Sequence, residues 1–147
     1  MSTGGNTSVT LSLQSASVLI VEDQNFVREL LGRLLTSLSV PKVGSVRSAE
    51  DALADLEKDP SCANVLFVDY ELPGMNGMRL LEKLRASSQP LLREIPVVML
   101  TAHNDLELYR DAARFGIAAF LVKPAGPAAL KSALEDALAG RRVIAPT

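Results

Sequence analysis

Short apolar runs rich in β-branched residues recur along the chain and alternate with stretches of helical periodicity. Four runs are clear and a weaker fifth lies at residues 42–46; the four are Val18–Val21, Val65–Val68, Val97–Leu100 and Ala119–Val122. Each run is too short for a typical helix and too uniformly apolar for a strand with one exposed face. The runs therefore predict strands buried on both faces.

Between these runs, apolar residues recur at the spacing of one helix face. We expect five helices, over residues 27–38, 48–56, 78–84, 106–113 and 130–138. Ser48-Ala49-Glu50-Asp51 resembles a capping box at the start of the second helix. Gly116 is placed to end the fourth helix, whereas Pro127 and Gly140 bound the fifth.

The order of elements is five repeats of a strand followed by a helix. Such alternation predicts an α/β fold with a parallel sheet that helices cover on both faces. We expect one domain over residues 17–140, a flexible Ser/Thr/Gly-rich arm over 1–16 and a short tail over 141–147. An added edge strand in the arm, where Val9, Leu11 and Leu13 alternate with polar residues, is an open alternative.

Polar residues that could bind ions or react follow four of the predicted strands. Glu22 and Asp23 follow the first run, Asp69 the run at 65–68, Thr101 and Ala102 the run at 97–100, and Lys123 the last. In a sheet of this kind the carboxyl ends of the strands share one edge, where active groups gather. Three carboxylates at that edge repel one another unless a cation neutralises them, and Mg²⁺ suits such a site. The Lys123 ammonium and the Thr101 hydroxyl could then bind an anion beside the metal. Together with a carboxylate nucleophile, these groups predict phosphoryl transfer.

Composition narrows the class of protein further. The chain has 147 residues, of which 48% are apolar and 22% charged, as in ordinary globular domains. A net charge of −2 argues against a general nucleic-acid clamp. One cysteine, Cys62, and one histidine exclude an internal disulfide and a zinc cage. Because no apolar run approaches about 18 residues and residues 1–17 lack a signal pattern, we expect a cytoplasmic protein without membrane contact.

Four stretches of the chain resemble the receiver domain of bacterial two-component response regulators, in particular that of the chemotaxis response regulators. The stretches are residues 18–24 (VLIVEDQ), 65–77 (VLFVDYELPGMNG), 95–102 (IPVVMLTA) and 120–124 (FLVKP). The resemblance covers about residues 17–140. It implies a doubly wound, flavodoxin-like sheet with strand order 2-1-3-4-5, and we expect a single-domain regulator.

The resemblance implies a phosphoacceptor and a metal site. Asp69 would accept a phosphoryl group from a phosphohistidine. Asp23 would bind Mg²⁺ directly, Glu22 would support it, and Asp69 and the backbone carbonyl of Glu71 would be further ligands. Lys123 would pair with the Asp69 carboxylate and then with the phosphoryl group. The chain would thus assist its own phosphorylation and dephosphorylation without being a dedicated turnover enzyme.

It also implies a switch. The Thr101 hydroxyl and the Ala102 amide would bind phosphoryl oxygens, and Phe120 stands where the family keeps a switch aromatic, here without a hydroxyl. Glu71 and His103 stand two residues after Asp69 and Thr101, at positions that tune the lifetime of the phosphoryl group. Two roles of His103 stay open: donation to a phosphoryl oxygen, or capping of the fourth helix.

The resemblance implies protein partners. These are a sensor histidine kinase or a histidine phosphotransfer protein, and a downstream protein that binds the fourth helix, fifth strand and fifth helix. A homodimer through that same surface is an open alternative. Two other functions compete: a receiver-like binding module that does not use phosphorylation, and an unrelated doubly wound enzyme for a flavin or nucleotide. The sequence lacks the glycine-rich turn and the P-loop that the latter would need.

Overall fold

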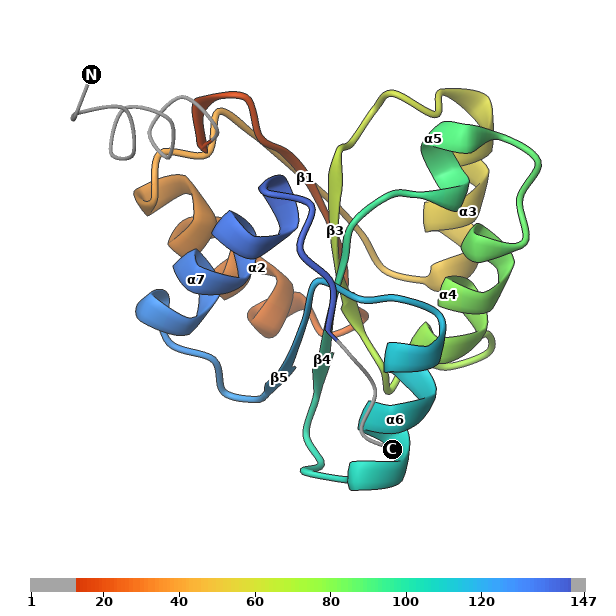
Figure 1. Ribbon diagram of the computed structural model, residues 1–147. Helices are drawn as coiled ribbons and strands as arrows, with labels where there is room; N and C mark the ends of the chain where they lie inside the picture. Colours follow the sequence, from red (N-terminus) through yellow and green to blue (C-terminus); the bar gives the residue numbers. More distant parts are fainter. Residues whose placement is uncertain (1–12, 144–147) are drawn as a thin grey trace, which may run out of the picture.

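A computed structural model describes residues 13–143 and shows a five-stranded parallel sheet between two layers of helices (Figure 1). The strands are β1 (Ser17–Val21), β2 (Lys42–Val46), β3 (Val65–Asp69), β4 (Val97–Thr101) and β5 (Ala119–Val122). Their order is β2-β1-β3-β4-β5, and all four neighbouring pairs are parallel. The predicted fold class and strand order are confirmed.

Six helices lie between Asn25 and Leu138, one more than predicted. They are α2 (Asn25–Ser37), α3 (Ala49–Lys58), α4 (Gly77–Arg85), α5 (Pro90–Arg93), α6 (Leu106–Arg114) and α7 (Pro127–Leu138). The additional helix, α5, is a single turn that begins at Pro90, whose fixed φ suits the first helical position. Four residues are too few to show a helical period, so the pattern of apolar residues could not reveal it.

The helix ends follow the predicted capping chemistry. The Ser48 hydroxyl accepts a hydrogen bond from the Asp51 amide at 3.0 Å and caps α3. Pro127 is in the first turn of α7. Gly116 and Gly140 follow α6 and α7 with φ of +82° and +75°, values that favour glycine. The predicted stops are therefore confirmed.

The two faces of the sheet bury different side chains. In β1, Leu19 and Val21 pack with α3, α4 and α6, whereas Val18 and Ile20 pack with α2 and α7. β3 and β4 show the same alternation and are buried along their whole lengths. β2 and β5 are only partly buried, because the strand order puts them at the two edges. The prediction that the run at 119–122 is buried on both faces is therefore wrong.

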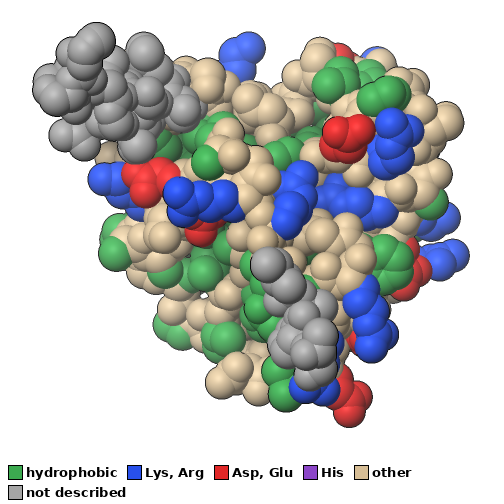
Figure 2. Space-filling model, viewed as in Figure 1, with side chains coloured by type: hydrophobic (Ala, Val, Ile, Leu, Met, Phe, Trp, Pro, Cys, Tyr) green, Lys and Arg blue, Asp and Glu red, His purple; other side chains and the backbone are tan. Residues whose placement is uncertain are grey.

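The segments outside the domain are described only in part. Val9 and Leu11, where an added edge strand was the alternative, lie outside the described residues. Arg142 donates to the Glu94 carbonyl at 3.1 Å, and the Val143 amide donates to the Ile117 carbonyl at 2.9 Å. Residues 141–143 thus lie against the body of the domain (Figure 1). Lys and Arg side chains gather near the middle of the face that Figure 2 shows. Within residues 13–143, every helix is too short or too polar to cross a membrane.

Gly77 allows the first turn of α4 to approach the end of β3. A Cβ atom at Gly77 would lie 2.5 Å from the Asp69 carbonyl oxygen, which is closer than real Cβ contacts. We expect Gly77→Ala to lower the free energy of unfolding by about 1–3 kcal/mol, the usual cost of overpacking. Gly32, inside α2, has no atom within 4 Å of such a Cβ. Gly32→Ala should instead raise the free energy of unfolding by roughly 0.5–1 kcal/mol. Urea unfolding measures both, and equal stabilities of the two variants would contradict this account.

Candidate functional site

Three carboxylates converge at the carboxyl ends of β1 and β3. Glu22 and Asp23 directly follow β1, and Asp69 is the last residue of β3. The parallel register pairs Val21 with Val68, so the two strands end side by side. One oxygen from each carboxylate lies within 4.8 Å of the other two. Glu22 and Asp69 are buried, at 1% and 3% exposure, so water screens their repulsion poorly.

Lys123 brings a positive charge to this cluster from the far end of the chain. It directly follows β5, and its Nζ lies 3.1 Å from Asp69 Oδ2 and 3.3 Å from Glu22 Oε1. The sequence places Glu22 101 positions away from Lys123, and the sheet brings them together. One ammonium against three carboxylates leaves an excess of negative charge.

That excess changes the ionisation of the site. Burial, with a further contribution from the Glu22 charge, raises the pKa of Asp69 to about 7 even though Lys123 opposes the shift. Burial alone would lower the pKa of Lys123, but the hydrogen bond and charge of Asp69, with Glu22, outweigh it and hold that pKa above its ordinary value. Asp69 is thus close to changing its charge near neutral pH, as functional groups often are.

Hydrogen bonds fix the position of Glu22. Its carboxylate accepts from the Gln24 amide at 3.1 Å, and its carbonyl accepts from the Arg28 guanidinium at 2.9 Å. Arg28 belongs to the first turns of α2, one turn after the loop that carries the acidic pair. This positioning residue was not predicted from the sequence, because a single arginine on a helix has no distinctive pattern.

A second group of polar atoms lies at the end of β4. The Thr101 hydroxyl is fully buried and donates to Glu71 Oε2 at 2.6 Å, and the Ala102 amide donates to Glu71 Oε1 at 3.2 Å. The Glu71 amide in turn donates to Asp69 Oδ1 at 3.1 Å. His103 is exposed, and its Nε2 lies 3.9 Å from Glu71 Oε2. Glu71 therefore links the residues at the end of β4 to Asp69.

Phe120 lies in β5, half-buried between the sheet and α6. Its ring meets the Tyr109 ring edge to face, with centroids 5.5 Å apart and planes at 86°. This geometry is favourable for aromatic pairs. Tyr109 lies within the predicted helix over residues 106–113, but the sequence did not identify it as the partner of Phe120.

The residues present fit a hard divalent cation. Glu22, Asp23 and Asp69 offer carboxylate oxygens, the ligand type that Mg²⁺ prefers, and their excess negative charge is what such an ion neutralises. Which of these side chains bind metal directly stays a prediction, as does the role of the Glu71 carbonyl.

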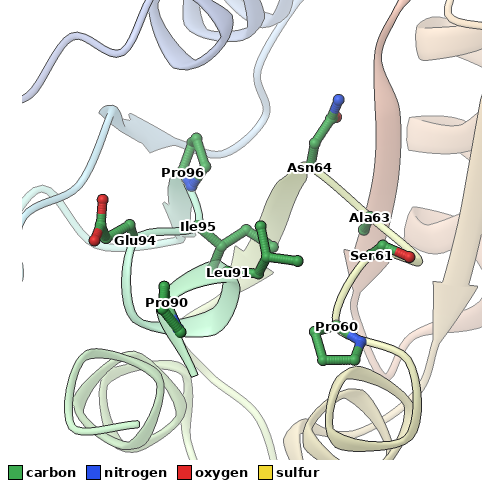
Figure 3. A pocket seen from close by; sticks show the side chains of 9 residues that line it. All are labelled: Pro60, Ser61, Ala63, Asn64, Pro90, Leu91, Glu94, Ile95 and Pro96. Atoms are coloured by element: carbon green, nitrogen blue, oxygen red, sulfur yellow. The ribbon is translucent and has the colours of Figure 1, made fainter. Parts of the chain in front are cut away.

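A hollow with a mainly apolar lining lies at the opposite end of the sheet from the carboxylates. Figure 3 shows a pocket of about 380 Å³ between the segment before β3 and the segment around α5, lined by Pro60, Ala63, Pro90, Leu91 and Ile95 among others. It adjoins the amino ends of β3 and β4, whereas the carboxylates adjoin their carboxyl ends. The polar site and this pocket are therefore separate.

Comparison with known proteins connects this site to a family. The family model of the response regulator receiver domain matches residues 18–135. A chemotaxis protein CheY homolog of Campylobacter jejuni is 31% identical over 121 residues, which cover 82% of this chain and 91% of that protein. The sensory/regulatory protein RpfC of Xanthomonas campestris is 35% identical over 136 residues, 90% of this chain but 18% of that protein.

Solved structures agree with the sequence comparisons. The crystal structure of a response regulator from Chloroflexus aurantiacus has a TM-score of 0.75 at 31% identity, covering 84% of this chain and 98% of that one. The chemotaxis protein CheY4 of Vibrio cholerae has a TM-score of 0.74 at 26% identity, covering 83% and 98%. With its fold, its matched residues and the carboxylates beside Lys123, the chain belongs to the response regulator receiver family.

Proposed function

We propose that the chain is a phosphorylatable receiver in which Asp69 accepts a phosphoryl group from a phosphohistidine. A carboxylate oxygen of Asp69 attacks the phosphorus, the P–N bond breaks, and its electron pair returns to the imidazole of the donor. The donor is a sensor histidine kinase or a histidine phosphotransfer protein. The observation that supports the proposal is the buried Asp69 carboxylate held 3.1 Å from Lys123 inside an acidic cluster.

The residues around Asp69 have different roles in the proposed reaction. Lys123 keeps the nucleophile in place and stabilises the incoming charge, as preorganised cations do in phosphoryl transfer. Glu22, Asp23 and Asp69 would hold Mg²⁺, which when bound supplies charge neutralisation for the transferred group. In the phosphorylated state, Thr101 and Ala102 would donate an O–H and an N–H to phosphoryl oxygens. The same groups would serve hydrolysis, so the chain assists its own dephosphorylation but turns over no other substrate.

The proposed reaction changes the shape of one face of the domain. Phosphorylation adds about 1.5 to 2 negative charges and strong acceptors. Thr101 would move toward them and Phe120 would rotate into the space it leaves, reshaping the face of α6, β5 and α7. A downstream protein, or a second copy of the chain, would bind to that face. The shift can be only as large as the difference in contacts between the two states. We place this signalling in the cytoplasm, where such kinases act.

Intact-mass spectrometry tests the proposed function. With Mg²⁺ and a small phosphodonor such as phosphoramidate, we expect the wild-type chain to gain the mass of one phosphoryl group. Asp69→Asn, or removal of Mg²⁺ by a chelator, should abolish the gain. A gain that persists in Asp69→Asn would contradict the proposal.

A receiver-like binding module that does not use phosphorylation is the second candidate. One observation favours it: the Glu71 carboxylate already accepts hydrogen bonds from the two donors that a phosphoryl group would need. A folded wild-type chain that binds Mg²⁺ but gains no phosphoryl group from any donor would select this function.

A further inference from the structure

The side chain of Glu71 lies where the proposed function needs a phosphoryl group. Its two carboxylate oxygens accept from the Thr101 hydroxyl and the Ala102 amide, at 2.6 and 3.2 Å. Thr101 is fully buried, and its Oγ1 also accepts from the His103 amide at 3.1 Å. The hydroxyl is therefore fully engaged, because its one proton goes to Glu71 and the oxygen receives the amide. Neither donor is free for another anion.

Glu71 also contacts the nucleophile. Its backbone amide donates to Asp69 Oδ1 at 3.1 Å, so the main chain is fixed beside the reacting carboxylate while the side chain crosses to the end of β4. Partial burial would raise the pKa of Glu71, but the hydrogen bonds from Thr101 and Ala102 outweigh it and hold that pKa below its ordinary value. Both carboxylate oxygens accept a hydrogen bond, as in an ionised side chain. A phosphoryl group on Asp69 would bring a second anion to the same two donors. Charge-assisted bonds of this type are strong, and like charges at one site repel.

We propose that Glu71 is a built-in competitor of the phosphoryl group. Its carboxylate must leave Thr101 and Ala102 before these two residues can bind a phosphoryl oxygen. This inference rests on the proposed function and adds a residue that limits it. Its consequence is that Thr101 is already held by an anion before phosphorylation, so the unphosphorylated chain keeps the β4 end ordered. Phosphorylation exchanges one anion for another of higher charge.

The Glu71 side chain is 33% exposed, so the displaced carboxylate can turn toward solvent. Glu71 Oε2 is 3.9 Å from His103 Nε2, and the His103 side chain is 71% exposed. A rotation of the Glu71 side chain in that direction releases both donors and leaves the bond from the Glu71 amide to Asp69 intact. The competition therefore needs one side chain to move, without refolding of the loop.

Binding of beryllofluoride with Mg²⁺, followed by amide NMR, tests the competition without a covalent step. Beryllofluoride bound to a carboxylate has the shape and charge of a phosphoryl group. A site that is open only in a fraction of molecules binds with affinity reduced by that fraction. Glu71→Ala should therefore tighten beryllofluoride binding about tenfold. Glu71→Asp keeps the charge but shortens the reach, and it should tighten binding about threefold. Glu50→Gln removes a carboxylate that bonds the Met75 amide instead, and it should change binding less than twofold.

Hydrogen exchange of the Ala102 amide gives a readout that does not depend on the proposed function. Ala102 is exposed, so its amide owes its protection to Glu71. Exchange in the unliganded protein should be at least tenfold faster in Glu71→Ala than in the wild type. Unchanged exchange, or beryllofluoride binding that Glu71→Ala leaves unchanged or weakens, would overturn the inference. Tightening in Glu71→Ala but not in Glu71→Asp would also overturn it, since charge alone would then be responsible. If no variant binds beryllofluoride, the proposed function fails, and the exchange rates alone decide the role of Glu71.

Discussion

Replacing Asp69 with Asn should stabilise the metal-free protein by about 2–4 kcal/mol near pH 8. The pKa of Asp69 rises from 3.8 to about 7 on folding, chiefly through burial and secondly through the Glu22 charge. A carboxyl with a raised folded-state pKa favours the folded state at low pH, and this contribution is lost as pH rises through the folded pKa. The stabilisation by Asn, which stays neutral, should therefore grow between about pH 4 and 7 and vanish below that window.

Urea unfolding of both proteins in chelator across this pH range measures the effect. Asp111→Asn is the matched control, because Asp111 forms an exposed ion pair with Arg114 on α6. It should change the free energy of unfolding by less than about 0.5 kcal/mol at every pH. Adding Mg²⁺ should remove much of the advantage of Asp69→Asn, since the ion neutralises the wild-type cluster. A stabilisation by Asp69→Asn that is independent of pH would show that the charge of Asp69 does not destabilise the folded protein.

Replacing Asp23 with Ala should slow phosphorylation of Asp69 by small phosphodonors about 100-fold. Asp23 supplies one of three carboxylates within 4.8 Å of one another, and it is the most accessible of the three. Its loss should weaken Mg²⁺ binding while Lys123 stays paired with Asp69. The initial rate of mass gain, measured over a Mg²⁺ titration, gives both quantities.

The control for Asp23→Ala is an acidic residue outside the cluster. Glu107 lies exposed in the first turn of α6, and Glu107→Gln should keep the wild-type rate within about twofold. If Asp23→Ala kept both the rate and the dependence on Mg²⁺, the carboxylate cluster would not be the metal site.

The arrangement of strands and the convergence of the acidic residues with Lys123 could be predicted from the sequence. A buried parallel strand needs apolar residues on both faces, so β1, β3 and β4 have unambiguous patterns. A polar residue directly after such a strand must lie at the shared edge, and the strand order that the receiver resemblance implies brings Asp69 near Glu22 and Lys123. Few backbone alternatives satisfy those constraints, and the structure agrees.

The remaining features depend on choices that short sequence patterns do not determine. Glu71 has a long side chain on a loop, and its contact with Thr101 depends on the direction in which that side chain turns. The close approach of Gly77 to the Asp69 carbonyl depends on the angle at which α4 packs. The half-buried state of β5 follows from its place at the sheet edge, which its apolar composition alone does not show. These features arise from tertiary packing, which local periodicity does not encode.

Identifying the modified residue tests the central claim most directly. The wild-type chain is phosphorylated with Mg²⁺ and a phosphodonor, then treated with borohydride, which reduces an aspartyl phosphate to homoserine. Tandem mass spectrometry of the digested chain then locates the homoserine. We predict homoserine at position 69 alone, and none after treatment without the phosphodonor. Reduction at another carboxylate, such as Asp23, with Asp69 unmodified, would contradict the assignment of Asp69 as the phosphoacceptor.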